Sequence, residues 1–390
     1  MEEFRMDGIR SRICSIYSLN RAFMKRKSGR MWKPSVMDYY LHMNRYNYIL
    51  NRQLVSGAYH AKPRRRFHIC DPKPRDIEAP HLVDGIVQSS VNANYLNERL
   101  RYVFLQENCA CQKGKGTDYA RNLFKEQLRR YFRRYGRDGV VLKIDIKSFF
   151  ASIDGDALHS LNERYIEDGW VVSMVEQWGV PQGGKGLGLG AETNQTESCI
   201  ALHPIDVFLK TVLGCRYMVR YQDDIMLVLR SKEEAHRVKV RLAEELAEYK
   251  LSLNVRKTQT YRLCDWYPFL GFRFTVTDSG KVLMRIRRES VSRIRRRAKR
   301  QAKFDLSSKT IEDSFTCWKA NASKGDNRYI IKRTEACIME IVRNQRELEK
   351  QLEAALARIE RLNATIEYLA MMSDVDISQP SETSQGGRAV

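Results

Sequence analysis

Three aspartates have the type and spacing expected of a metal-dependent phosphoryl-transfer site. Asp145 ends a β-branched run in VVLKIDI, and Asp223 and Asp224 form the centre of VRYQDDIMLV, where apolar runs flank a tight turn. With no counter-charge expected beside them, carboxylates at strand ends repel one another unless cations lie among them. Two Mg²⁺ ions about 3.5–4 Å apart, which stabilise the attacking and leaving oxygens of an in-line displacement, need such ligands. For the DD pair alone, an ordinary hairpin turn is the alternative.

Strand and helix patterns alternate around these aspartates. Apolar or β-branched runs predict strands at 140–146, 217–221, 225–229 and 267–274. Helical spacing predicts short helices within 1–60 and longer ones at 82–104, 117–135 and 232–250. The Pro-broken, basic segment 62–80 suits a hairpin or an extended loop. Because tight hairpins join some strands, the core is predicted to be α+β rather than a dinucleotide-binding sheet.

The charge balance points to a polyanionic partner. The 390 residues contain 68 Lys and Arg against 47 Asp and Glu, a net charge of +21. So much positive charge repels itself unless a polyanion neutralises it. No window approaches 18 consecutive apolar residues, and the N-terminal MEEFRMDGIRSR lacks the apolar core of a signal peptide. Nine Cys without a CxxC pair argue against a zinc ribbon or a disulfide framework, so we expect a reducing, cytoplasmic location.

The motifs around the aspartates, taken in order, resemble a known family. YQDD at 221–224 and DIKSFF at 145–150 resemble the palm motifs of reverse transcriptases, and RRFHICDPKPRDIEAP resembles the fingers segment before the palm. CQKGKGTDYA at 111–120 resembles the basic Gly loop of the bacterial enzymes. LNVRKTQT at 253–260 and FLGFRF at 269–274 resemble the motifs that follow the palm helix. A chance match of all these motifs in order is improbable.

The resemblance implies a role for each matched catalytic position. Asp145 and Asp223 would be the principal ligands of two Mg²⁺ ions, Asp224 would complete the carboxylate cluster, and Ile146 belongs to the implied ligand set. Phe150 falls where the family keeps an aromatic steric gate that excludes a ribose 2′-OH. A core position is the alternative, and one of Phe149 and Phe150 is expected in the core because strand neighbours face opposite ways.

Substrate contacts are implied in the same way. Lys73 and Arg75 match fingers residues that hold the incoming triphosphate, and Lys257 matches a Lys proposed to protonate the leaving pyrophosphate. For all three, the alternative is a solvated surface charge. Gln195 ends GLGLGAETNQ, which resembles the segment that contacts template and nucleotide.

That last segment departs from the family pattern. Gly188 stands where the pattern has Pro, and Asn194 stands where it has Ser. GVPQGG at 179–184 is a second candidate, resembling the version in group II intron enzymes. We prefer the downstream register because its distance to Asp223 fits the bacterial branch without a gap, which makes 179–184 a loop. The residues around Gln195 are most similar to the reverse transcriptases of diversity-generating retroelements and their phage-borne or defence-associated relatives.

Two basic segments are predicted to bind nucleic acid. Residues 281–303 contain eleven Lys or Arg and one Glu, in the position where polymerases place a thumb that grips the template–primer duplex. A solvated helix face is the alternative, although so many like charges would repel one another. The predicted contacts are Arg285, Arg287, Arg288, Arg293, Arg295, Arg296 and Arg297, with Lys113 and Lys115 of the Gly loop.

The C-terminal region differs in kind. From Ile338 to Leu369 apolar residues step by three and four, interrupted at Gln345, which predicts a heptad helix over 338–372. Self-association, docking on the thumb and binding of an accessory protein all fit this seam. Residues 373–390 are predicted to be disordered.

The combined prediction is a right-hand polymerase of the α+β class with a C-terminal coiled-coil-like helix. Its segments are an N-terminal helical region (1–60), fingers (61–139), a palm (140–275) and a thumb (276–337), followed by the heptad helix and the tail. The expected activity is RNA-directed DNA synthesis from an RNA template, a primer and dNTPs, in a bacterial or phage retroelement. The alternatives are a defence-associated enzyme, an RNA polymerase with the same palm, protein-primed or untemplated synthesis, and a catalytically idle RNA-binding scaffold.

Overall fold

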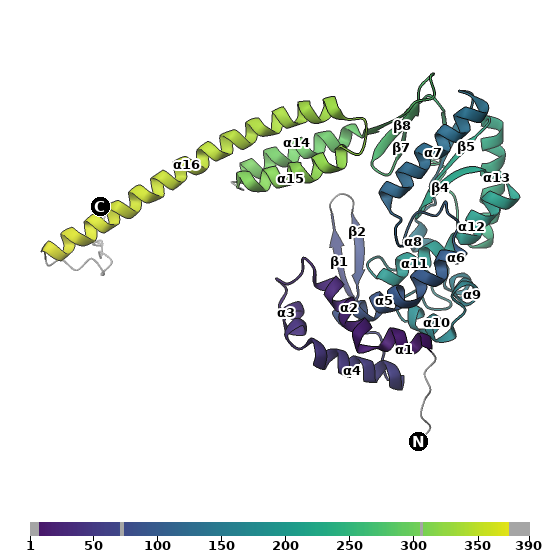
Figure 1. Ribbon diagram of the computed structural model, residues 1–390, viewed down its shortest axis with the longest axis horizontal. Helices are drawn as coiled ribbons and strands as arrows, with labels where there is room; N and C mark the ends of the chain where they lie inside the picture. Colours follow the sequence, from purple (N-terminus) through teal and green to yellow (C-terminus); the bar gives the residue numbers. More distant parts are fainter. Residues whose placement is uncertain (1–7, 71–73, 305–306, 374–390) are drawn as a thin grey trace, which may run out of the picture. The chain divides into compact units, whose positions relative to one another are not determined.

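The chain folds into two compact units. The computed structural model describes residues 8–70, 74–304 and 307–373, so the predicted tail falls almost wholly outside the described residues. The first unit comprises Met1–Leu270 with Phe274–Val282, and the second comprises Gly271–Arg273 with Leu283–Val390. Their elements are labelled in Figure 1. The segments predicted within 1–275 belong almost entirely to the first unit, and their boundaries stay predictions.

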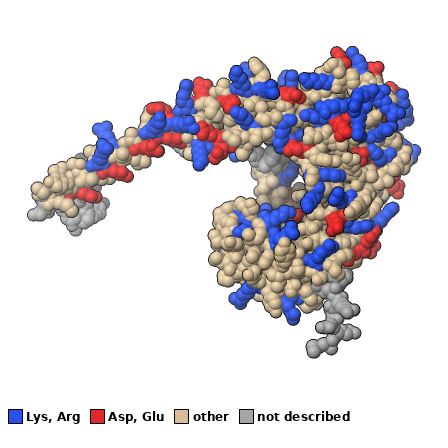
Figure 2. Space-filling view, in the orientation of Figure 1, with Lys and Arg blue, Asp and Glu red and all other residues tan. Residues whose placement is uncertain are grey.

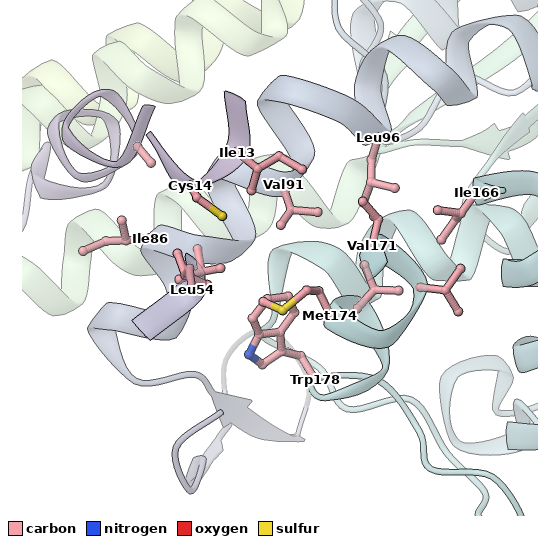
Figure 3. Close-up of a cluster of buried hydrophobic side chains, with 14 of the residues drawn as sticks. Ile13, Cys14, Leu54, Ile86, Val91, Leu96, Ile166, Val171, Met174 and Trp178 are labelled. Atoms are coloured by element: carbon pink, nitrogen blue, oxygen red, sulfur yellow. The ribbon is translucent and has the colours of Figure 1, made fainter. Parts of the chain in front are cut away.

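The N-terminal part of the first unit is helical, as the sequence predicts. Its helices are α1 (Gly8–Cys14), α2 (Ile16–Lys27), α3 (Pro34–Leu41), α4 (Met43–Ser56), α5 (Leu82–Val91), the π-helical η1 (Asn92–Leu96) and α6 (Asn97–Val103). Ser15 begins α2 by accepting a hydrogen bond from the Ser18 N–H at 3.1 Å. Apolar side chains of these helices pack with Trp178, which is buried, into one cluster (Figure 3). This cluster supports the hairpin that follows α4.

That hairpin consists of β1 (Arg65–Ile69) and β2 (Arg75–Ala79), which pair antiparallel and confirm the prediction for 62–80. Its second strand is tied to a distant loop, because the Glu78 N–H donates to the Leu189 carbonyl at 2.7 Å. Gly190 has φ +133°, and a Cβ there would lie 2.8 Å from the Glu78 carbonyl oxygen. Only glycine allows this close approach.

A four-stranded antiparallel sheet forms the centre of the first unit. Its strands are β4 (Tyr217–Tyr221), β5 (Asp224–Leu229), β3 (Val140–Ile144) and β6 (Gln259–Arg262), in that spatial order. Alternate residues of β3, namely Val140, Leu142 and Ile144, join a buried cluster with α13 (Lys232–Glu248). The amphipathic α7 (Thr117–Tyr135) packs on β4 and β5. Buried apolar strands therefore carry the polar residues at their ends.

The remaining helices of the first unit lie between the strands in sequence. They are α8 (Phe149–Ser152), α9 (Gly155–Ile166), α10 (Gly169–Glu176), α11 (Glu192–Ala201), α12 (His203–Val207) and the π-helical η2 (Phe208–Val212).

The prediction of one strand over 267–274 is wrong. The structure has two strands there, β7 (Tyr267–Phe269) and β8 (Phe272–Val276), which form a sheet with β9 (Val282–Ile286). Leu270 and Gly271 have φ of +43° and +85°, so they form a turn instead of continuing the strand. The division between the two units runs through this sheet.

Three helices make up most of the second unit: α14 (Arg288–Lys303), α15 (Ser308–Ala322) and α16 (Arg328–Ser373). Ile294, Phe315 and Ile338, one from each helix, lie in their common core. The helix α16 starts ten residues before the predicted heptad segment, so no break separates that segment from the predicted thumb. None of the described helices combines the length and apolarity that crossing a bilayer requires.

Candidate active site

The three aspartates come from two neighbouring strands of the central sheet. Ile144 pairs with Ile225, so continuing the register by one residue places Asp145 opposite Asp224. Tyr221 pairs with Asp224, which makes Gln222 and Asp223 the two turn residues between β4 and β5. The turn predicted at Asp223–Asp224 is therefore displaced by one residue, and Asp224 begins the returning strand. All three carboxylates therefore lie at the end of the sheet where β3 stops and β5 begins, which we call the aspartate edge.

Gln222 adopts a left-handed conformation with φ +55°, which a two-residue hairpin needs at its first turn position. This conformation costs a non-glycine residue about 1–2 kcal/mol. Its side chain is held on both ends: Ser198 Oγ donates to Gln222 Oε1 at 2.6 Å, and Gln222 Nε2 donates to Cys111 Sγ at 2.9 Å. These bonds offset the strain and fix the turn that carries Asp223.

A buried ion pair also stabilises the turn between β4 and β5. The Arg220 guanidinium makes two hydrogen bonds of 2.6 Å with the Asp206 carboxylate, and both side chains are fully buried. A third nitrogen, Nη1, donates to the Gln222 carbonyl at 3.0 Å. Burial, the largest single influence, would lower the pKa of Arg220, but the Asp206 charge and hydrogen bonds, with a smaller contribution from Cys199, together raise that pKa. The guanidinium thus stays charged and anchors the turn backbone.

Two lysines face the outer carboxylates. Lys257 Nζ lies 3.6 Å from Asp145 Oδ2, and Lys143 Nζ lies 3.6 Å from Asp224 Oδ1. The expectation that no counter-charge lies beside the aspartates is therefore wrong, since Lys143 precedes Asp145 by two residues. Burial, followed by the Asp224 and Asp145 charges, raises the pKa of Asp223 above its ordinary value. The turn carboxylate is the one whose negative charge is least compensated.

The donor chemistry of this edge fits a divalent cation. Carboxylate oxygens are hard ligands of the kind that Mg²⁺ binds, and a cation would relieve the repulsion that raises the Asp223 pKa. Ile146 has an apolar, buried side chain, so its backbone carbonyl is its only oxygen ligand. Within the described ranges, no three His, Cys, Asp or Glu side chains are grouped tightly enough to hold one ion as they stand. Asp145 and Asp224 instead lie against Lys257 and Lys143.

Phe149 and Phe150 begin the short helix α8, not a strand as predicted. Phe149 is buried in the cluster that β3 and α13 form, whereas Phe150 is half-buried at its margin, with ring centroids 5.4 Å apart. The Leu187 N–H donates to the Phe150 carbonyl at 2.7 Å, which joins this helix to the Gly-rich loop before α11. Of the two rings, Phe150 is the one available to a substrate.

Gln195 is exposed on α11, the helix that also supplies Ser198 to the hairpin. Before it, Asn194 Nδ2 donates to the Gly188 carbonyl at 2.9 Å. The two residues that depart from the family pattern therefore interact with each other and close one loop. The upstream candidate, 179–184, is a turn in which the Gly184 N–H donates to the Pro181 carbonyl at 2.9 Å.

One of the two predicted triphosphate ligands, Arg75, lies on the β1–β2 hairpin. Arg75 is the exposed first residue of β2, paired with Ile69. Lys73 lies outside the described residues. No described contact joins Arg75 to the aspartate edge.

The predicted nucleic-acid ligands divide into outward and inward groups. Arg288, Arg293, Arg296 and Arg297 of α14 are exposed, and Arg285 is exposed on β9. Arg287 is partly buried before α14, as is Arg295, whose Nη2 lies 3.4 Å from Thr334 Oγ1. In the Gly loop, Lys113 is exposed, whereas the Lys115 ammonium donates to the Gln106 and Asn108 carbonyls at 3.3 and 3.0 Å. Lys115 therefore stabilises its own loop.

Comparison with known proteins agrees with this architecture. Residues 91–274 match the family model described as reverse transcriptase (RNA-dependent DNA polymerase). The match covers both aspartate-bearing motifs, so this segment is similar to the domain that the family model describes. The comparison with curated proteins gave no match.

Solved structures of low similarity include telomerases. One is telomerase from Candida albicans in complex with the TWJ fragment of telomeric RNA (TM-score 0.46, 12% identity, 73% of this chain, 55% of that chain). Another is apo telomerase from Candida tropicalis (TM-score 0.44, 12% identity, 77% of this chain, 59% of that chain). The chain thus spans less than two thirds of either telomerase. Similarity at this level gives no information on what the chain binds.

Sequence reasoning missed the residues that support the hairpin. Arg220 lies in the otherwise apolar or aromatic strand YMVRY, and Asp206 lies in the apolar segment HPIDVFLK. A single charge inside each of two apolar segments is a signal of a buried pair, because an isolated buried charge is costly. Ser198 and Cys111 carried no such signal.

Proposed function

We propose that this chain is an RNA-directed DNA polymerase that extends a primer 3′-OH with dNTPs. One observation carries the proposal: Asp145 and the Asp223–Asp224 pair lie on one edge of the sheet, inside the segment that matches the reverse transcriptase family. Burial and the neighbouring Asp224 and Asp145 charges, which raise the pKa of Asp223, add to it.

The residues of the site have distinct tasks in this reaction. The 3′-oxygen loses its proton and bonds to the α-phosphorus of the dNTP, while the bond from that phosphorus to pyrophosphate breaks. Asp145 and Asp223, completed by Asp224 and the Ile146 carbonyl, would hold two Mg²⁺ ions. When bound, these ions supply positive charge to the attacking and leaving oxygens. Lys257, 3.6 Å from Asp145, would donate a proton to the pyrophosphate.

Further residues would select and hold the substrates. Phe150 would exclude a ribose 2′-OH, and Gln195, Lys73 and Arg75 would contact the incoming nucleotide. The exposed arginines of α14 would bind the template–primer duplex through its phosphates. A pocket of about 480 Å³ beside them, lined by Arg288, Arg295 and Arg333, adds positive charge to the same unit.

The prokaryotic assignment is part of the proposal. The residues around Gln195 support an enzyme of the diversity-generating type or a defence-associated relative. The Asn194–Gly188 hydrogen bond is compatible with this, because it closes the loop despite the two departures from the family pattern.

Primer extension on an RNA template with Mg²⁺ and labelled dNTPs tests the activity. We expect Asp223→Asn to lower the rate by about 10²- to 10³-fold or more, since a preorganised charge at the reacting centre is removed. Asp278→Asn, which removes an exposed carboxylate that pairs with Arg137, is the matched control and keeps activity. Equal extension by wild type and Asp223→Asn would refute the proposal. If Asp223→Asn abolished primer extension but the protein kept its function in the cell, the alternative of a catalytically idle RNA-binding scaffold would be favoured.

A further inference from the structure

The helix α16 has two parts with opposite surroundings. Up to Gln345 it packs on α14 and α15, with Ile338 and Val342 buried. Its last recorded contact with α15 is at Glu349, whose carboxylate accepts hydrogen bonds from the Ser308 N–H and Oγ at 2.6 and 2.8 Å. Figure 1 shows α16 continuing beyond the ends of both neighbours. Almost every described side chain from 350 to 372 is exposed.

The exposed part carries an unbroken heptad pattern. The a positions are Leu352, Ile359 and Ile366, and the d positions are Leu348, Ala355, Leu362 and Leu369. Leu352, Ile359 and Leu362 are 61%, 52% and 53% exposed, so these apolar side chains lie mostly in water. At 1.5 Å per residue the stripe from 348 to 369 is roughly 32 Å long. A mostly exposed apolar stripe of this length indicates an interface.

The helix cannot cover this stripe itself. The seam positions that face α14 and α15, such as Ile338, are already buried there. Folding back would require a break in the helix, yet 328–373 contains no Gly or Pro. A heptad stripe is the pattern that a second helix covers.

We propose that residues 348–369 form a parallel, two-stranded coiled coil with the same segment of a second copy of this chain. Ile at a with Leu at d is the combination that favours parallel dimers, and Ile359–Leu362 and Ile366–Leu369 repeat it. In the parallel register the flanking g–e′ pairs are Gln351–Leu356, Arg358–Asn363 and Thr365–Ala370. None of these pairs joins like charges, so a second copy meets no repulsion.

The surface around the stripe suits an exposed coil. Charged side chains of both signs occupy the outward b, c and f positions, including Lys350, Glu353, Glu360 and Arg361. Figure 2 shows this mixture of Lys, Arg, Asp and Glu along the helix, interspersed with uncharged surface. A mixed outer face keeps such a coil soluble without adding a single-sign field. This inference does not depend on the proposed polymerase activity.

The mass of the full chain in solution, measured by light scattering over a range of concentrations, tests the proposal. We expect wild type to approach twice the 45.6 kDa chain mass as concentration rises. Ile359→Glu/Ile366→Glu places charges in the seam and gives the mass of one chain. Ala357→Glu/Ala364→Glu adds the same charges at f positions and stays dimeric. Circular dichroism and primer extension on both double variants show whether the rest of the chain remains folded and active.

Cysteine cross-linking tests the register. Leu352→Cys pairs with itself only in a parallel, in-register dimer, so mild oxidation should give a covalent dimer. Ala357→Cys, on the outer face, should give no more than wild type with its nine native thiols. Several results would overturn the proposal: a wild-type mass of one chain at every concentration, as for a helix that binds a different protein, or a mass of three or more chains. Unchanged mass of the seam variant, or equal cross-linking of both cysteine variants, would do the same.

Discussion

Two polar helices, α11 of the first unit and α14 of the second, place their polar side chains in opposite environments. In α11, Thr193, Asn194, Thr196, Glu197 and Ser198 are all buried. In α14, the residues with buried side chains are Ile294, Ala298 and Gln301, and most of the arginines face water. Two of these side chains, Asn194 and Ser198, hydrogen-bond the loop at Gly188 and the β4–β5 hairpin. The second leaves its charges available for a polyanion.

This difference shows that catalysis and duplex binding, the two tasks of a polymerase, place different constraints on the sequence. Chemistry needs carboxylates held in one place, which requires a rigid and largely buried support. Duplex binding needs charge along a surface and tolerates mobile side chains. Variants of the first unit are therefore expected to change catalysis and stability, and variants of the second to change affinity and its salt dependence.

The largest effect is expected at Arg220. Arg220→Met leaves Asp206 buried without its partner, which costs about 3–5 kcal/mol of unfolding free energy. The double variant Arg220→Met/Asp206→Leu should regain most of that stability, because apolar residues replace both charges. It should not regain primer extension, since the Gln222 carbonyl still lacks its guanidinium donor. Denaturant unfolding and extension rates, measured on the same samples, check this. Activity that returns together with stability would show that Arg220 does not position the turn.

The next effect concerns Glu197. Burial raises its pKa to about 8, and Asn162 donates to its carboxyl oxygen at 3.1 Å. Since the folded-state pKa exceeds the ordinary value of 4.5, this contribution to stability is full below about pH 4.5 and is lost progressively as the pH rises from there through about 8. Glu197→Gln should remove this loss, at about 1.4 kcal/mol per unit of pKa difference. Unfolding at pH 5.5 and 8.5 measures it. Exposed Glu126→Gln is the control, and an unchanged pH dependence in Glu197→Gln would contradict the assignment.

Phe150→Ala tests the selection of deoxynucleotides. Removing the half-buried ring should raise NTP use relative to dNTP use by about tenfold, the scale on which pocket size discriminates. Phe149→Leu is the matched control: it should lower stability, because Phe149 is buried, and leave the NTP-to-dNTP ratio unchanged. Incorporation of single NTPs and dNTPs by each variant measures the ratio. A ratio that follows Phe149 and not Phe150 would reverse the assignment.

The smallest effect is expected on α14. Arg296→Gln and Arg297→Gln should each weaken duplex binding a few-fold and reduce the slope of log affinity against log salt by roughly 0.7–0.9. The rate at saturating duplex should not change. Arg343→Gln and Lys350→Gln on α16 remove equal charge from the same unit and are the controls. Binding measured between 50 and 300 mM salt separates the pairs. If the α14 variants and the α16 variants weakened duplex binding equally, net charge alone, and not the position of the arginines on α14, would determine the affinity.

The sequence predicted most elements because they follow from local patterns. The alternation in VVLKI and the spacing in 232–250 specify β3 and α13 almost to their ends. The grouping of Asp145 with Asp223 and Asp224 was predictable from the motifs, because a two-residue turn directly after a strand leaves few other places for these side chains. The error at 267–274 arose where two positive φ values at Leu270 and Gly271 bend an otherwise continuous apolar run.

The support of the site was not predictable from local pattern. Ser198, Cys111 and Gln222 lie in separate segments, and only the tertiary fold brings them together. Lys143 was overlooked because strand alternation alone does not show that it reaches Asp224 across the sheet. Single-residue contacts between distant elements carry no periodic signal.

The hydrogen bond from the Glu78 N–H to the Leu189 carbonyl joins the β1–β2 hairpin to the loop before α11, so these two segments move together. Gly190 also packs against the Glu78 carbonyl. A movement of the β1–β2 hairpin therefore moves the loop in which Asn194 Nδ2 donates to the Gly188 carbonyl. A displacement of the hairpin is therefore transmitted through the backbone to the first turn of α11. Any side chain at position 190 would disconnect that linkage.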